Sequence, residues 1–264
     1  MSIVLDEVTF RYPDGTAAVD GVHLSIERGE RVAIVGQNGA GKTTMVKLMN
    51  GLLKPTTGTV TIDGEPTTKR TTATIAQSVG YVFQNPDDQI FTSSVQTELE
   101  YVPRYRRWDE ARRDERVARA AAICGLEPHL KVNPNDLPIA IRKFVAIGAV
   151  LVGDCRYVIL DEPTAGLDVP GLRLLNTLID RLRLEGISVV TITHDMRFVA
   201  DSFERVIAMA EGTVVADGTC EEVFADDEVL TRCRIRRPEA AQLMRDLGIS
   251  TTALRLDDIV HLIP

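Results

Sequence analysis

Several features that mark other classes of protein are scarce or missing in this 264-residue sequence. The longest apolar run, residues 144–153, is well short of the ~20 residues that cross a bilayer, so we expect no membrane-spanning segment. A net charge of -8, from 30 Lys and Arg against 38 Asp and Glu residues, excludes a protein whose whole surface grips nucleic acid. The few cysteines have neither CxxC nor Cys/His spacing, which favours free thiols over a disulfide framework or a zinc site: Cys124, Cys155, Cys220 and Cys233.

The N-terminal residues also lack the basic segment, apolar segment and cleavage site of a secretion signal, so we expect a cytosolic location. Hydrophobic residues at 44% and charged residues at 26% are ordinary globular values and exclude disordered, collagenous and coiled-coil chains. A chain of this length can bury a large core without disulfides or metals. The sequence therefore predicts one large globular domain or two small ones.

The hydrophobic pattern predicts an α/β chain. Residues 1–30 alternate apolar and polar side chains around a Pro13-Asp14-Gly15 turn, which indicates an antiparallel hairpin. Alternation of strand and helix patterns in the rest of the chain implies a mostly parallel sheet with helices on both faces. Strands are expected at 32–35, 59–62, 79–83, 157–160, 187–192 and 206–209, and helices after residue 42, throughout 93–152, at 172–184 and in the tail from about 224 to 264.

A glycine-rich turn lies between the strand expected at 32–35 and the helix that follows it. Residues 36–44 read GQNGAGKTT, which matches GxxxxGK followed by Thr. In this context the backbone N–H groups and the helix N-terminus can surround phosphates, Lys42 can reach the β and γ phosphates, and the Thr43 hydroxyl can bind Mg²⁺. The alternative is a glycine-rich turn without a ligand. The expected nucleotide-binding residues are Gly36, Gln37, Asn38, Gly39, Ala40, Gly41, Lys42, Thr43 and Thr44.

Further polar side chains follow other expected strands at the carboxyl edge of the sheet, where ligands of open α/β sheets bind. We expect Asp161 to orient Mg²⁺ or its water, and Glu162 to polarise the water that attacks a γ-phosphate. His194 can contact that phosphate, and the amide of Gln84 can bridge Mg²⁺ or the attacking water. The alternatives are a solvated loop for the two carboxylates, a neighbour of a helix cap for His194 and a plain Asn-Pro turn after Gln84.

In this order and spacing, the motifs resemble those of ATP-binding cassette (ABC) ATPases over residues 1 to about 225. The resemblance implies an α/β fold with a P-loop NTPase (RecA-like) core, an antiparallel β subdomain and an inserted α-helical subdomain, with ATP and Mg²⁺ as ligands. The corresponding segments are 36–44 (Walker A), Gln84 (Q-loop), 157–162 (Walker B), 167–168 (D-loop) and His194 (switch histidine).

The resemblance also implies roles and boundaries. Catalysis would rest on Glu162, His194, Gln84 and Lys42, and the metal would be held by Thr43, Gln84 and Asp161. Tyr12 falls where the family carries an aromatic side chain that stacks on adenine, although a hairpin or core aromatic is the alternative. Within one ABC ATPase domain, 1–264, the nucleotide-binding core with its β subdomain would comprise 1–92 and 153–225, the helical subdomain 93–152 and a C-terminal extension 226–264.

Residues 84–91, QNPDDQIF, resemble more particularly the ATPase subunits of energy-coupling factor (ECF) importers for vitamins and transition metals. That resemblance implies a peripheral ATPase at the cytoplasmic face of the cell membrane, with integral membrane transport subunits as partners and no nucleic acid. Ile90, Phe91 and the helix after them would contact the membrane partner, unless they pack internally. The two alternatives are a soluble ABC ATPase outside transport and a regulatory ATP-binding subunit with little hydrolysis of its own.

One motif departs from the family. Where the family has its LSGGQ signature, residues 137–141 read LPIAI, so Pro138 lacks an N–H group and Ile139 and Ile141 add bulk near the backbone. An ordinary helix capped by Asp136 is the alternative interpretation of this segment. Since ABC ATPases close head to tail, with each signature serving the partner's nucleotide, the departure favours a heterodimer with a second ABC ATPase subunit.

Overall fold

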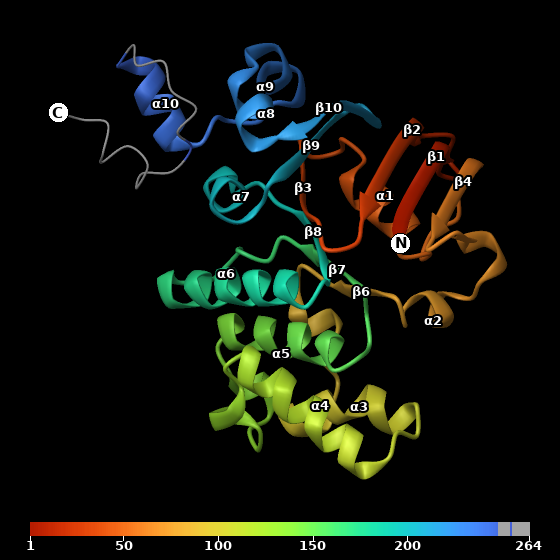
Figure 1. Cartoon of the computed structure of the whole chain (residues 1–264), viewed down its shortest axis with the longest axis vertical. Coiled ribbons are helices and arrows are strands. Elements are labelled where there is room, and N and C mark those ends of the chain that lie inside the picture. Colours follow the sequence, from red (N-terminus) through yellow and green to blue (C-terminus); the bar gives the residue numbers. More distant parts are fainter. Residues whose placement is uncertain (248–253, 255–264) are drawn as a thin grey trace.

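The smaller of two β-sheets is antiparallel in this structure, a computed structural model that describes residues 1–247 and 254. Its strands pair in the spatial order β2 (Ala17–Glu27), β1 (Ser2–Arg11), β4 (Thr57–Ile62) and β5 (Glu65–Pro66). The first three lie side by side in Figure 1. The expected hairpin is confirmed, with Ser2 opposite Glu27 and Ile3 opposite Ile26. Alternate side chains of these strands face the core, which is why the sequence alternates here.

The larger sheet is parallel except at one edge, where its last strand runs antiparallel. A mostly parallel sheet was expected, because the central strands read as continuous apolar runs and are buried on both faces. The antiparallel edge strand was not expected, since its residues are mostly half-exposed or exposed. In spatial order the strands are β10 (Thr213–Thr219), β9 (Arg205–Ala210), β3 (Arg31–Val35), β8 (Ser188–Ile192), β7 (Tyr157–Asp161) and β6 (Val79–Val82).

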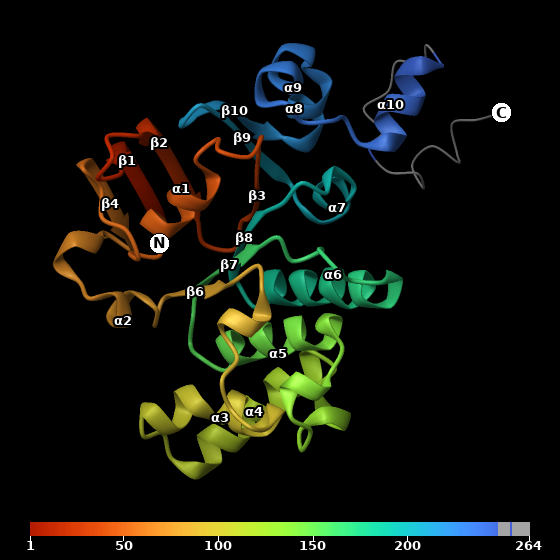
Figure 2. The ribbon, with the colours of Figure 1, turned by 180° about the vertical axis from the view of Figure 1, so that it is seen from behind.

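The larger sheet separates two apolar cores. Val32 and Ile34 point into the core shared with the smaller sheet and α1 (Lys42–Met49), whereas Ala33 and Val35 point into the opposite core. That second core is covered by α6 (Val169–Leu184) and α7 (Met196–Ser202) and continues into the helical end of the molecule (Figure 2). Because both faces are covered, the carboxyl edge of the sheet is where side chains can reach a ligand.

Residues 93–152 form three main helices rather than the continuous helical stretch that the sequence predicted. They are α3 (Val95–Tyr105), α4 (Glu110–Ile123) and α5 (Ile139–Leu151), gathered at one end of the molecule (Figures 1 and 2). Gly125 and Pro128 end the helical pattern after α4, because glycine favours a left-handed turn there and proline lacks an N–H donor. Short turns of 3₁₀ helix replace helix at Glu127–His129 and Pro134–Asp136.

The alternative in which Asp136 caps the helix near the signature segment is wrong. Helix α5 starts at Ile139 and its N-cap residue is Pro138, which offers no side-chain hydrogen bond. Asp136 ends a turn that Asn133 caps, with the N–H of Asn135 donating to Asn133 Oδ1 at 3.0 Å. The first turn of α5 therefore lacks the usual side-chain acceptor at its N-terminus.

The chain after residue 219 continues in short helices. Helix was expected from about residue 224, and α9 (Asp227–Cys233) and α10 (Glu239–Asp246) lie in that range. The sequence did not predict the start of α8 (Cys220–Ala225) or the breaks between these helices. Asp227 accepts hydrogen bonds from Arg237, at 2.8 Å, and from Arg245, and these contacts join α10 to the helix before it. The rest of the expected tail, 248–253 and 255–264, lies outside the described residues.

No helix among residues 1–247 and 254 combines the length and the apolar character needed to cross a bilayer. The longest, α6, has 16 residues and carries Asp180 and several arginines.

Candidate functional site

A cavity of about 660 Å³ opens at the carboxyl edge of the larger sheet. The loops that follow β3, β6, β7 and β8 each bring side chains to it, as the strand order requires. The β1–β2 hairpin closes one side through residues 16–18, a contribution that no sequence motif indicated. The sequence-predicted residues that line the cavity are Tyr12, Asn38, Gly39, Ala40, Gly41, Lys42, Thr43, Thr44, Gln84, Asp161, Glu162 and His194.

Two glycines of the loop between β3 and α1 are required by its geometry. Gly36 and Gly41 have φ angles of 147° and 99°, in the region that favours glycine. A Cβ at Gly36 would lie 2.2 Å from the Met209 carbonyl oxygen, and one at Gly41 would lie 2.2 Å from the Ala18 carbonyl oxygen. Any side chain at these positions would push the loop away from the sheet.

The ammonium group of Lys42 is held inside this loop. Its Nζ donates to the carbonyl oxygens of Gly36, at 2.7 Å, and Gln37, at 2.9 Å, and the residue is 6% exposed. Burial lowers the pKa of Lys42, while the negative charges of Glu162 and Asp161 oppose that shift. The result is a buried cation beside the cavity whose present partners are neutral carbonyl groups.

Gly36 and Gln37 are the two expected nucleotide-binding residues that do not line the cavity. Their carbonyl oxygens face Lys42 instead, and the N–H of Gln37 donates to the carbonyl oxygen of Cys233 at 2.9 Å. Their direct part in nucleotide binding stays a prediction. The contact with Cys233, at the end of α9, is one that the sequence did not indicate.

Helix α1 begins directly after the loop with its N-terminus at the cavity. Its N-cap residue, Gly41, offers no side-chain acceptor, so the N–H groups of the first turn remain free to bind an anion. Thr43 and Thr44 lie in this turn, and the Thr44 hydroxyl is within 3.0 Å of the hydroxyl of Tyr12. Tyr12 is 38% exposed at the rim of the cavity, with its ring edge-on to Phe10. The loop, the helix terminus and Lys42 together offer positive potential to a phosphate chain.

Glu162 and His194 meet on the opposite side of the cavity. The backbone of Glu162 is left-handed, with φ 47°, and its N–H donates to the carbonyl oxygen of Ile192 at 2.8 Å. Its Oε2 accepts from the N–H of His194 at 3.3 Å, and its Oε1 lies 3.4 Å from His194 Nε2. Burial raises the pKa of Glu162, and the adjacent His194 opposes the shift. A carboxylate of raised basicity beside an imidazole is suited to accept a proton.

Asp161 ends β7 and shares the cavity with Thr43 and Gln84, which all offer oxygen atoms. Among the residues that the structure describes, no group of three or more His, Cys, Asp or Glu side chains could hold a metal by itself. This donor set fits Mg²⁺, which binds through one or two carboxylates together with phosphate oxygens and water.

Two residues that no sequence motif indicated contact Asp161 and Glu162. Tyr81, on β6, donates from its hydroxyl to Asp161 Oδ2 at 2.6 Å, and Lys143, on α5, donates from Nζ to the carbonyl oxygen of Glu162 at 2.9 Å. Tyr81 lies within an expected strand, where an aromatic residue reads as core. Lys143 lies within the helical stretch expected at 93–152, where no motif marks it. The signature segment 137–141 does not line this cavity.

Comparisons with known proteins agree with this geometry. Residues 19–165 match the sequence family described as "ABC transporter". The chain is 40% identical over 249 residues to the energy-coupling factor transporter ATP-binding protein EcfA of Methanoculleus marisnigri, covering 94% of this chain and 90% of that protein. It is 38% identical over 250 residues to EcfA of Methanothermobacter thermautotrophicus, covering 94% of this chain and 80% of that protein.

Solved structures give the same result. CbiO1 of Clostridium perfringens, described as part of the ABC transporter complex cbiONQ, superposes with a TM-score of 0.80 at 35% identity, over 92% of this chain and 98% of that one. The ATP-binding cassette MJ0796, as a dimer in a post-hydrolysis state with ADP and Pi, superposes with a TM-score of 0.74 at 28% identity, over 83% of this chain and 98% of that one. The expected P-loop fold and the resemblance to ABC ATPases are confirmed. The chain belongs to the family of ATP-binding cassette ATPases of ABC transporters.

Proposed function

We propose that this chain is the ATP-hydrolysing subunit of an ECF-type importer and couples hydrolysis to uptake of a vitamin or a transition-metal ion. The observation that carries the proposal is the convergence of Lys42, Asp161, Glu162 and His194 on one cavity. The EcfA names of the relatives and the CbiO1 structure support the type of transporter. The protein would associate with the membrane peripherally, through integral membrane subunits.

In this proposal the cavity binds ATP by its phosphates. The N–H groups of residues 38–44 and the α1 N-terminus surround the phosphate oxygens, and Lys42 exchanges a carbonyl partner for the β and γ phosphates. Thr43, Gln84 and Asp161 would hold Mg²⁺, which supplies positive charge to the phosphate oxygens. Tyr12 offers its exposed ring at the rim to the adenine base. Phosphoryl transfer to water depends chiefly on such positioning and charge neutralisation.

Glu162 would act on the attacking water, and His194 on the phosphate. The left-handed backbone of Glu162 directs its carboxylate to the cavity beside His194, and burial raises its pKa. An ionised carboxylate there accepts a proton from water as the γ-phosphate is attacked. The imidazole of His194, half-exposed at the cavity, can donate a hydrogen bond to the departing phosphate.

The assembly we propose is a heterodimer with a second ABC ATPase. The MJ0796 cassette was solved as a dimer, and in the family the signature of one subunit serves the nucleotide of the other. Here α5 starts at Ile139, which is 39% exposed, after Pro138, which has no N–H. The branched side chains of Ile139 and Ile141 and the missing N–H of Pro138 would weaken the hydrogen bonds of this segment to the partner's nucleotide. Two copies of this chain would share that defect at both sites, whereas a partner with an intact signature would complete one site.

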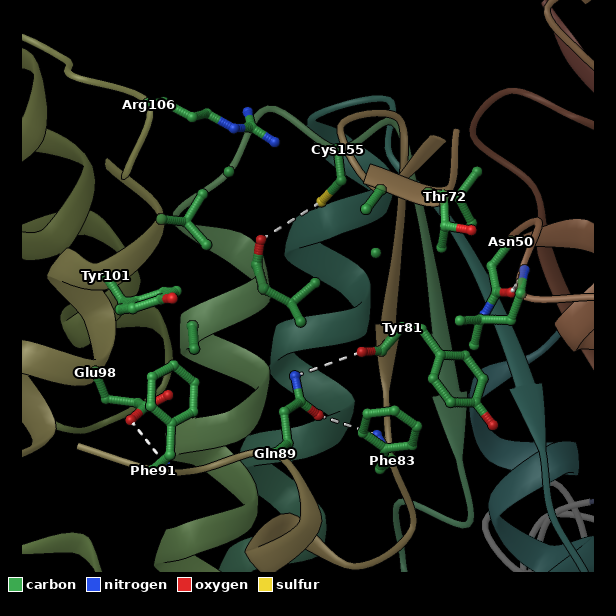
Figure 3. Close-up of a pocket in the computed structure, with 18 residues that line it drawn as sticks. Asn50, Thr72, Tyr81, Phe83, Gln89, Phe91, Glu98, Tyr101, Arg106 and Cys155 are labelled. Atoms are coloured by element: carbon green, nitrogen blue, oxygen red, sulfur yellow. Dashed lines mark hydrogen bonds between the residues drawn. The ribbon is translucent and has the colours of Figure 1, made fainter. Parts of the chain in front are cut away.

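An apolar groove of about 360 Å³ between β6 and the helices α3 and α5 is the proposed docking site for a helix of an integral membrane subunit (Figure 3). Phe91, 65% exposed, stacks edge-on against Tyr101 at 4.6 Å, and Glu98 Oε2 fixes the loop by accepting the N–H of Phe91 at 3.2 Å. Ile90 packs against the core instead, so only part of the expected contact surface is exposed. Gln89 lines the groove, and its side-chain oxygen accepts a hydrogen bond from the Phe83 N–H at 3.1 Å. Phe83 directly precedes Gln84, so this contact links the groove to the nucleotide cavity.

Replacing Glu162 by Gln in the complete transporter tests the proposed function. We expect ATP binding to be retained and hydrolysis and uptake to fall by about a hundredfold or more, because the amide cannot accept the proton. Glu221→Gln, an exposed carboxylate on α8, is the control that leaves the rate unchanged. Unchanged turnover in Glu162→Gln would favour a regulatory nucleotide binder. Co-purification with ribosomes or DNA instead of membrane proteins would favour an ABC ATPase outside transport.

A further inference from the structure

Lys143 is a buried cation next to the proposed catalytic carboxylate. It lies in the first half of α5, is 7% exposed, and its Nζ donates to the carbonyl oxygen of Glu162 at 2.9 Å and to that of Pro163 at 3.5 Å. A charge buried to this degree is retained only when polar partners offset its loss of water. The partners here are the backbone of the loop after β7 and the negative charges of Asp161 and Glu162.

The backbone that Lys143 contacts is in an unfavourable conformation. The left-handed region is unfavourable for residues other than glycine, and Glu162 adopts it with φ 47°. Its two backbone polar groups are both held, the N–H by the carbonyl oxygen of Ile192 and the carbonyl oxygen by Lys143. This pair of contacts fixes the direction in which the Glu162 side chain leaves the backbone.

The neighbouring residue of α5 holds the other loop of the cavity. Arg142 lies 3.2 Å from Asp87, in the turn that follows Gln84. Consecutive side chains at the start of one helix thus contact the Gln84 loop and the Glu162 loop. The first residues of this helix belong to the segment 137–141, which differs from the family signature. The proposed assembly places this segment at the partner's nucleotide.

We propose that Lys143 is a positioning residue for Glu162: it holds the carbonyl group of Glu162 and thereby keeps the carboxylate directed at the attacking water. The inference rests on the proposed catalytic role of Glu162. Lys143 does not line the cavity and acts through the backbone of Glu162. It also ties the orientation of Glu162 to the position of α5, so movement of the helical end of the molecule changes the geometry of the cavity.

The kinetic test compares Lys143→Met and Lys143→Arg with Arg142→Met in the complete transporter. Met keeps the length of the apolar stem, so packing is preserved while the ammonium group is lost. We expect Lys143→Met to lower kcat about tenfold or more with a KM for ATP within about twofold of wild type, and Lys143→Arg to recover part of the loss. Lys143→Met with kcat within about twofold of wild type would overturn the proposal.

A crystal structure of the isolated variant chain gives a readout that needs no hydrolysis. In wild type the Glu162 Oε1 atom lies 3.4 Å from His194 Nε2. Without the Lys143 donor we expect the carbonyl group of Glu162 to turn and its carboxylate to leave this position. Arg142→Met, which removes a charge from the other loop, is expected to leave the carboxylate in place.

The two measurements separate the inference from the proposed function. A wild-type complex that does not hydrolyse ATP defeats the proposed function, and the position of the Glu162 carboxylate in Lys143→Met still decides whether Lys143 acts on Glu162. A carboxylate in its wild-type position would overturn the inference even if hydrolysis is normal. If Lys143→Met proves unfolded by circular dichroism, Lys143→Gln replaces it, because its shorter amide side chain is a weaker donor to the carbonyl oxygen. In Lys143→Gln we expect a displaced carboxylate together with a lower kcat, and a lower kcat with the carboxylate unmoved overturns the inference.

Discussion

The hydroxyl group of Tyr81 donates a 2.6 Å hydrogen bond to Oδ2 of Asp161. The two residues come from neighbouring parallel strands, β6 and β7, and Asp161 is the only one of the pair that lines the cavity. Burial raises the pKa of Tyr81, as do its hydrogen bond to Asp161 and the charge of that carboxylate, so its hydroxyl stays protonated and acts as a donor. Tyr81, which does not line the cavity, therefore sets the rotamer of the Asp161 carboxylate, which does.

Replacing Tyr81 by Phe is expected to raise the Mg²⁺ concentration that nucleotide binding requires. Without the donor, the Asp161 carboxylate regains rotamer freedom that it loses again when the ion binds. We expect the half-saturating Mg²⁺ concentration for ATP binding to rise about three- to tenfold, equivalent to ~1 kcal/mol. Isothermal titration at several Mg²⁺ concentrations measures this directly.

A matched variant separates this effect from general destabilisation. Tyr157 also donates to an aspartate, Asp63 Oδ1 at 2.8 Å, but lies away from the cavity. Both Phe variants lose a hydrogen bond to a charged group and should lower the free energy of unfolding by about 1–3 kcal/mol. An equal shift of the Mg²⁺ requirement in Tyr157→Phe would count against a specific role for Tyr81.

Replacing Lys42 by Met is expected to reduce ATP affinity by about ten- to a hundredfold, because a charged donor to the phosphates, worth about 1.5–3 kcal/mol, is lost. Lys54 supplies the control, since its Nζ also donates to backbone carbonyl oxygens, those of Thr67 and Arg70, but outside the cavity. Lys54→Met should bind ATP like the wild type. Equal affinity in Lys42→Met and the wild type, measured by calorimetry on folded protein, would contradict the phosphate-binding role.

The buried carboxylate of Glu162 is expected to make stability depend on pH. Because its folded pKa is raised, the native state binds the proton more tightly than the unfolded state. The contribution of Glu162 to stability is therefore present in acid and is lost as pH rises from the ordinary carboxylate range, about 4.3, through the raised folded pKa. Glu162→Gln lacks this loss, so its Tm should exceed that of the wild type at neutral pH and approach it in acid. A Tm difference that is constant with pH would contradict this.

Restoring the signature tests the heterodimer. The test uses the Glu162→Gln variant, which should retain bound ATP. We expect the chain with its own segment 137–141 to stay monomeric and the chain with the restored signature to form ATP-dependent homodimers. Light scattering after size exclusion measures the mass. Ile141 packs against the core, so circular dichroism must first show that the restored chain is folded. ATP-dependent dimers of the chain with its own segment 137–141 would argue for a homodimer. The substitutions are Pro138→Ser, Ile139→Gly, Ala140→Gly and Ile141→Gln.

The parallel sheet and the phosphate loop could be predicted because their causes are local in sequence. A strand buried on both faces must be continuously apolar, as Val32 to Val35 are, and the loop after it needs glycine at positions 36 and 41. The carboxyl edge then brings Asp161, Glu162 and His194 together without further information.

The remaining features depend on contacts between distant segments. Strand β10 is an edge strand that pairs with β9, and most of its residues are half-exposed. Its sequence therefore shows no clear alternation of apolar and polar side chains. Lys143 and Glu162 are 19 residues apart, and their contact exists only once α5 packs beneath the sheet. Asp136 reads as a helix cap, yet Pro138 lies closer to the start of α5 and takes that position. Composition and spacing do not specify such choices, because several local arrangements satisfy the same pattern.

The hydrogen bond from the Gln37 N–H to the Cys233 carbonyl oxygen has a practical consequence. The resemblance to ABC ATPases extends only to about residue 225, yet α9 supplies an acceptor for the strand-to-helix turn that surrounds Lys42. A chain ending before α9 would leave that donor to solvent and expose the surface that Cys233, itself fully buried, covers. Expression boundaries for this protein should therefore include α9.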